Sequence, residues 1–147
     1  MLTQHDLLIL ARAALAATLG FIIGWERRVS GAPIKARTIA LASLTAAALT
    51  AVGYEGFATG TDRIIQGIVT GIGFLGAGVI LHGANGEVRG LTTAATMWAV
   101  TVVGVAIGSG HELLGVLLAA LIYLIAAWGE WPVLAGLRRE RHRRTSN

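Results

Sequence analysis

The chain has 147 residues, of which 54% are hydrophobic and only 14% charged, and its formal net charge is +4. A soluble domain of this length needs more polar residues to cover its surface, so the composition excludes a soluble protein and indicates a membrane protein. The chain contains no cysteine, which excludes disulfides and thiolate metal sites.

Five apolar segments follow one another along the chain, each close to the roughly 17 to 25 residues that a helix needs to cross a bilayer. They run over Leu7–Ile23, Thr38–Gly53, Ile64–Leu81, Leu91–Ile107 and Leu113–Trp128. The second is the weakest, because it is short and rich in alanine and threonine, and its alternative is a re-entrant or surface helix. The sequence predicts an all-α, polytopic transmembrane helical bundle of about five spans over residues 1–131, followed by a basic tail over residues 132–147.

Basic residues between the segments predict the orientation, because cytoplasmic loops collect lysine and arginine. Most of them fall in the first loop, the third loop and the tail: Arg27, Arg28, Lys35, Arg37, Arg89, Arg138, Arg139, Arg141, Arg143 and Arg144. This alternation predicts an N-terminus outside and a C-terminus in the cytoplasm. Directly after a span, the arginine tail is more simply an anchor for anionic lipids than a nucleic-acid site.

Tryptophans are expected at the membrane interfaces, where amphipathic rings prefer to lie. Trp25, Trp128 and Trp131 fall at the predicted cytoplasmic ends of spans. Trp98 lies within a span, and we expect it to pack between helices.

The third segment contains TGIGFLGAGVIL, which matches the G-x-G-x-x-G of dinucleotide-binding turns. The context excludes a nucleotide site, because no acidic residue follows at about 20 residues to hold a ribose. On a helix, the glycines instead form two bare faces on nearly opposite sides: Gly67, Gly71 and Gly78 on one, Gly73 and Gly76 on the other. Small residues let membrane helices approach closely, so we expect a central helix that is packed on both sides. The alternative is a helix broken at the glycines, with carbonyls available to an ion. The two faces also allow a homodimer.

Two polar groups are predicted at opposite membrane faces. On the outer side, Arg12 lies within reach of Asp62 and Gln66, and the alternative for Arg12 is snorkelling to the headgroups. The cytoplasmic group comes from three segments and consists of Glu26, Arg27, Arg37, Thr38, Asn85, Arg89, Thr92 and Thr93. Thr92 or Thr93 is expected to cap the fourth helix.

The cytoplasmic group has two interpretations. It is either a binding or regulatory site for a partner or ion, or it combines positive-inside anchoring with ordinary turn and cap chemistry. The first interpretation predicts that Glu26→Gln and Arg37→Gln each abolish activity at normal abundance.

No enzyme constellation is present in the sequence. His5, His82, His111 and His142 are scattered over both predicted sides without helical pairing, which argues against a zinc site. Serine, histidine and carboxylate residues do not gather as a triad requires. The sequence therefore predicts no catalytic residue, no metal and no cofactor.

Five short motifs carry a family resemblance. They are Gly24-x-Glu26-Arg27, Arg37-Thr38, Asp62-Arg63-Ile64, the glycine run GIGFLGAG at residues 71–78, and VRGLTTAA at residues 88–95. Together they resemble the MgtC/SapB family of bacterial membrane proteins over roughly residues 7–128. The resemblance implies an inner-membrane protein of about five spans, linked to adaptation to low magnesium and, in pathogens, to virulence. The best described activity in the family is restraint of the F-type ATP synthase through its membrane sector.

The chain departs from the family pattern in two places. Members often add a soluble C-terminal domain resembling an ACT fold, and we expect only the membrane domain here. Arg28 stands where the first motif tends to continue with a second acid, which argues against an acidic cation cage.

Two hypotheses of function follow. The chain is either a small regulatory protein that binds a membrane partner, or a transporter or binding protein for magnesium or another ion, acting as an oligomer through Asp62, Gln66, Glu26 and Asn85. The sequence favours the first, because acids within the spans, the usual mark of a cation route, are missing.

Overall fold

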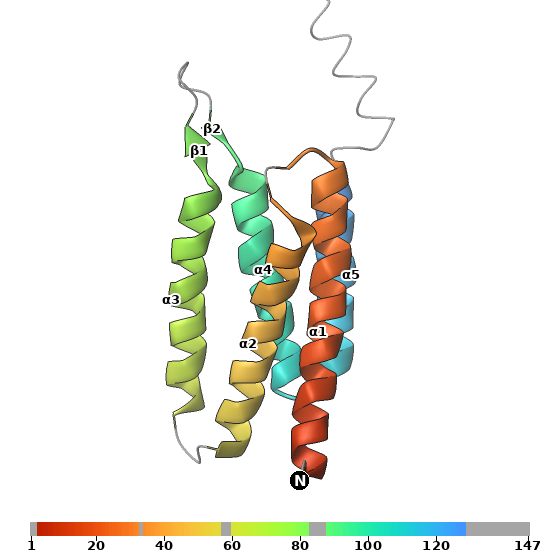
Figure 1. Cartoon of the computed structure of the whole chain (residues 1–147), viewed down its shortest axis with the longest axis vertical. Coiled ribbons are helices and arrows are strands. Elements are labelled where there is room, and N and C mark those ends of the chain that lie inside the picture. The colour runs from red at the N-terminus through yellow and green to blue at the C-terminus, as the bar shows by residue number, and fades with distance from the viewer. Residues whose placement is uncertain (1–2, 33, 57–59, 83–87, 129–147) are drawn as a thin grey trace, which may run out of the picture.

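A computed structural model describes residues 3–32, 34–56, 60–82 and 88–128 of the chain. In this part, five helices stand side by side and run alternately up and down (Figure 1). They are α1 (Gln4–Val29), α2 (Ala36–Gly56), α3 (Thr61–Val79), α4 (Leu91–Gly108) and α5 (Glu112–Ala127), with two short antiparallel strands, β1 (Leu81–His82) and β2 (Val88–Arg89), between α3 and α4. The predicted all-α helical bundle is confirmed.

Three of the described helices, α1, α2 and α4, are long and apolar enough to cross a membrane. The second segment, the weakest of the five in the sequence, is thus one of the three. The apolar helix α5 is shorter, with 16 residues, and α3 opens with the polar residues Thr61, Asp62 and Arg63.

The alternating helices bring basic residues together at one end of the bundle. The end of α1, the strands, the start of α4 and the end of α5 lie at the top of Figure 1, with the N-terminus at the bottom. Arg28, Lys35, Arg37 and Arg89 belong to this top end and are exposed. At the opposite end of the bundle, α5 begins with the acidic residue Glu112.

The orientation in the bilayer is the first testable prediction. Loops rich in lysine and arginine stay in the cytoplasm, and the loops after Tyr54 and Gly110 are poor in them. Reporter fusions after Tyr54 and after Gly110 should therefore report an external location, and one after Gly86 an internal location. The measurement is paired alkaline phosphatase and green fluorescent protein activity in a bacterial host. An internal signal at Tyr54 would contradict the predicted topology.

The bundle core forms around α2 and α4, which pack against each other and against α1. Its largest fully buried apolar side chains are Ile23, Ile39, Met97, Ile107, Val100 and Val103. Helices approach closely where one of them carries glycine: a Cβ placed on Gly24 would lie 2.8 Å from the Ala36 carbonyl oxygen, and one on Gly20 would lie 2.9 Å from Ser43 Cβ. Bare backbone at these positions therefore sets the spacing between α1 and α2.

The prediction that the third segment is the central helix is wrong. Helix α3 lies at the edge of the bundle, packs on α4 and more sparsely on α2 (Figure 1), and buries only Ile72 and Gly76. Of its five glycines, only Gly76 lies close to another helix, since a Cβ placed there would lie 3.8 Å from Ala94 Cβ. A Cβ on Gly67, Gly71, Gly73 or Gly78 would enter open space. The broken-helix alternative is also wrong, since α3 is continuous through all of them.

Trp98 is a second correction. Its side chain is 48% exposed, so it lies on the outside of α4 rather than between helices. The buried side of α4 is taken by Met97 and Val100, its neighbours on the helix. Trp25 and Trp128 are exposed near the top ends of α1 and α5, as expected of interfacial rings.

Candidate polar site at the end of α1

Glu26 and Arg27 form a buried ion pair in the last turns of α1. Arg27 Nε donates to Glu26 Oε2 at 2.6 Å and Arg27 Nη2 donates to Glu26 Oε1 at 2.8 Å. The two side chains are only 9% and 10% exposed. The bidentate geometry is the strong form of an arginine–carboxylate pair, and the burial protects it from solvent screening.

The pair also ties α1 to α5. Ser30 donates its hydroxyl to Glu26 Oε1 at 2.7 Å, and Arg27 Nη2 donates to the backbone carbonyl of Ala126 in the last turn of α5. The last carbonyls of a helix have no partner within the helix, so a guanidinium there satisfies an acceptor and complements the helix dipole. Arg27 therefore fixes where α5 ends relative to α1.

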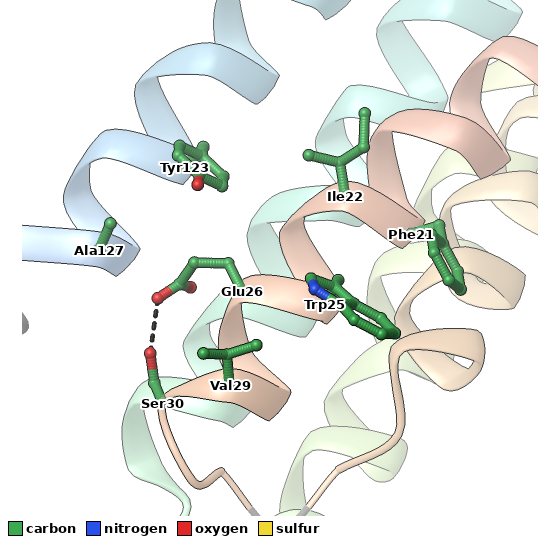
Figure 2. Close-up of a pocket in the computed structure, with 8 residues that line it drawn as sticks. All are labelled: Phe21, Ile22, Trp25, Glu26, Val29, Ser30, Tyr123 and Ala127. Atoms are coloured by element: carbon green, nitrogen blue, oxygen red, sulfur yellow. Dashed lines mark hydrogen bonds between the residues drawn. The ribbon is translucent and has the colours of Figure 1, made fainter.

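An open groove of about 720 Å³ lies beside this pair, between α1 and α5. Figure 2 shows Glu26 pointing from α1 toward Tyr123 and Ala127 of α5, with its hydrogen bond to Ser30. The groove is lined by Phe21, Ile22, Trp25, Glu26, Val29, Ser30, Tyr123 and Ala127. It is an apolar groove with one polar corner.

The other members of the predicted cytoplasmic group lie at the same end of the bundle, on other elements. Arg37 and Thr38 are exposed at the start of α2, and Arg89 is exposed on β2. The hydrogen bonds of Glu26 go to Arg27 and Ser30, not to these residues. These residues therefore share one end of the bundle, and Asn85 lies outside the described residues.

The predicted threonine cap of α4 is wrong. The N-cap is Gly90, which has a φ of +89° and no side chain to cap the helix. Its close approach to the Val79 carbonyl leaves no room for a Cβ, so both the backbone conformation and the packing require glycine. Thr92 is exposed, whereas Thr93 is 3% exposed and belongs to the core.

At the other end of the bundle, Arg12 pairs with Glu112 rather than with Asp62. Arg12 Nε donates to Glu112 Oε1 at 2.8 Å, joining α1 to the start of α5. Asp62 and Gln66 lie exposed on α3. This pair could have been predicted from the sequence, because Glu112 lies at the start of the fifth segment, on the same predicted side of the membrane as Arg12.

A second groove, of about 550 Å³, separates α3 from α2. Its walls are mainly apolar, with leucine and isoleucine on both helices, and two of the open α3 glycines face it. It is lined by Thr38, Leu41, Ala42, Thr45, Ala46, Leu49, Ile64, Gly67, Ile68, Gly71, Ile72, Leu75 and Thr101.

Among the described residues, no three histidine, aspartate or glutamate side chains converge to hold a metal ion. The acids instead pair locally, as Glu26 does with Arg27 and Glu112 with Arg12. The charged features at the two ends of the bundle, within the described residues, are therefore ion pairs, and the grooves beside the helices are mainly apolar.

Comparison with known proteins identifies the family. The MgtC family model matches residues 13–131, which span all five helices except the first turns of α1. The chain belongs to the MgtC family. Its similarity to individual members is spread along the membrane domain: it is 40% identical to protein MgtC of Salmonella typhimurium over 127 residues, covering 86% of this chain and 52% of that protein.

Two further MgtC-family relatives extend the comparison. Protein SrpB of Synechococcus elongatus is 38% identical over 131 residues, covering 79% of this chain and 72% of that protein. An uncharacterised Haemophilus influenzae protein is 37% identical over 132 residues, covering 83% of this chain and 56% of that protein. The chain thus spans between about half and three quarters of these relatives. No solved structure matches it.

Proposed function

We propose that this MgtC-family protein is a bacterial inner-membrane regulator that acts by binding another membrane protein, in adaptation to low magnesium or in virulence. The observation that carries the proposal is the groove between α2 and α3, with the open glycines Gly67 and Gly71 on its wall. Without a hydrophobic driving force in lipid, close backbone approach at small residues is what holds membrane helices together.

The groove has the features of a helix-binding surface. Leu41, Leu49, Ile64 and Leu75 supply apolar walls on both sides, and the glycines admit a partner backbone. An apolar helix lying in such a groove is a common recognition mode. The F-type ATP synthase, through its membrane sector, is the first partner to test, because the family resemblance implies it.

Ion transport is less well supported by the charges. The Escherichia coli relative YhiD, 38% identical over 123 residues, is by name a candidate magnesium transporter. Magnesium prefers carboxylate ligands, yet Glu26 is neutralised by Arg27 and Glu112 is paired with Arg12. Apart from the Glu26–Arg27 pair, the buried polar side chains of the described residues are the uncharged Ser43, Thr50, Thr93, Thr96 and Thr101.

The experiment compares two activities in vesicles with and without the protein. ATP synthase is reconstituted, proton-driven ATP synthesis is measured, and magnesium uptake is followed in parallel with a fluorescent indicator. We expect ATP synthesis to fall and magnesium uptake to remain at background. Magnesium uptake that depends on the protein would support transport and overturn the proposal.

Filling the groove should separate binding from folding. A Cβ on Gly71 would meet no neighbouring element within 4 Å, and the residue lines the groove. In Gly71→Leu the chain should therefore fold normally and lose its partner. Gly73→Leu is the matched control, because Gly73 is equally open but does not line the groove. The readout is co-purification with the partner and inhibition of ATP synthesis, at equal abundance in the membrane. Equal partner binding by both variants would remove the groove from the proposal.

A further inference from the structure

We propose that the groove between α1 and α5 binds a phospholipid whose headgroup carries a primary ammonium, with one acyl chain along the apolar wall. This site is separate from the α2–α3 groove and does not depend on the partner proposed there. Its volume of about 720 Å³ is that of a small-molecule site and exceeds the 550 Å³ of the other groove.

The position of the groove fits a lipid of one leaflet. It begins near the ends of α1 and α5, where Trp25 and Ser30 lie, and extends toward the middle of the bundle along Phe21, Ile22 and Tyr123 (Figure 2). Trp25 is 53% exposed, as expected of an amphipathic ring at the headgroup level. An acyl chain therefore has an apolar wall below a polar corner.

Glu26 gives the polar corner its chemical preference. A carboxylate offers about four acceptor positions, and the hydrogen bonds to Glu26 are two from Arg27 and one from Ser30. Oε2 receives only the Arg27 Nε bond, which leaves it able to accept from a ligand that enters the groove. An ammonium group donates N–H to this oxygen, and the neighbouring aromatic faces favour a cation.

The net charge of the corner favours a zwitterion. Glu26 and Arg27 neutralise each other within the pair, so neither a bare cation nor an anionic headgroup gains a net charge attraction from it. A zwitterionic phospholipid with its ammonium at Glu26 adds no net charge to this corner. No glycine lines this groove, in contrast to the α2–α3 groove, so it lacks the bare backbone that a partner helix needs.

The test compares two headgroups that differ at the nitrogen, where methyl groups in one replace the N–H donors of the other. The full chain is reconstituted in vesicles holding equal amounts of phosphatidylethanolamine and phosphatidylcholine with identical acyl chains. Lipids retained after mild detergent extraction are counted by native mass spectrometry. We expect about tenfold preference for phosphatidylethanolamine, the effect of one hydrogen bond to a charged group. Equal retention of the two lipids overturns the proposal, and this comparison requires no variant.

A variant pair locates the lipid. Ala127→Leu fills the groove from α5 and should abolish the preference, whereas Ala120→Leu makes the same change at an exposed position of α5 outside the groove and should preserve it. Circular dichroism and gel filtration confirm that both variants fold. A preference that persists in folded Ala127→Leu, or that is lost in folded Ala120→Leu, contradicts the site.

Discussion

Glu26→Gln should lower the free energy of unfolding by about 3 kcal/mol, the low end of the range for breaking a buried ion pair. The amide cannot balance the Arg27 guanidinium, whose side chain is only 9% exposed and also holds the end of α5 through Ala126. Unfolding in mixed micelles with a denaturing detergent measures the change. The double variant Glu26→Gln/Arg27→Gln should lose less than the two single variants together, because it leaves no buried charge without a counter-charge.

Arg37→Gln is the matched control for this prediction. Arg37 is exposed at the start of α2, so its replacement should change stability by about 0.5 kcal/mol or less. If Glu26→Gln were as stable as the wild type, the prediction would be contradicted, and the ion pair would have to be solvated.

The same geometry changes how activity data on the predicted cytoplasmic group are interpreted. The binding-site interpretation of the sequence predicts loss of activity at normal abundance for both variants. Because Glu26 is a structural partner of Arg27 and Ser30, Glu26→Gln should instead lose abundance along with activity. Arg37→Gln, which disturbs no such network, is the variant whose activity tests a partner site at this end of the bundle.

The order of the helices and the shared location of the charged loops were predictable from the sequence, because both depend on local properties. Apolar runs set the helices, and the bases between them mark one end of the bundle. The pairing of Glu26 with a neighbouring base was also predictable, because Glu26 is an acid among several basic residues. The role of Ser30 was not, since a serine four residues after Glu26 carries no signal until the helix ends there.

Helix neighbours were not predictable, because they depend on which surfaces meet across the bundle. The glycine run of α3 stands out in the sequence, yet the close contacts occur at more scattered glycines on α1 and α4, such as Gly24 and Gly104. A single glycine among large residues is enough to admit a neighbouring backbone. The run of glycines on α3 leaves a surface that, within one chain, is mostly uncovered.

Gly104→Ala should therefore destabilise the bundle more than a change at any open glycine of α3. A Cβ on Gly104 would meet the Ser43 carbonyl oxygen and would lie 2.8 Å from Ala46 Cβ, so α2 must move away from α4. Neither obstacle is a flexible side-chain end: one is backbone and the other is a Cβ. We expect a loss of about 1 to 3 kcal/mol, the usual effect of overpacking a core.

Gly73→Ala is the control, since it adds the same methyl group where no atom lies within 4 Å. It should stabilise the chain by about 0.5 to 1 kcal/mol, because alanine loses less backbone freedom than glycine when a helix forms. Unfolding of both variants in mixed micelles measures the change in the free energy of unfolding, which should be negative for Gly104→Ala and positive for Gly73→Ala. If Gly73→Ala destabilised the protein and Gly104→Ala did not, the close helix contacts would lie on α3, in an assembly of several chains, and the arrangement of α2 against α4 would be wrong.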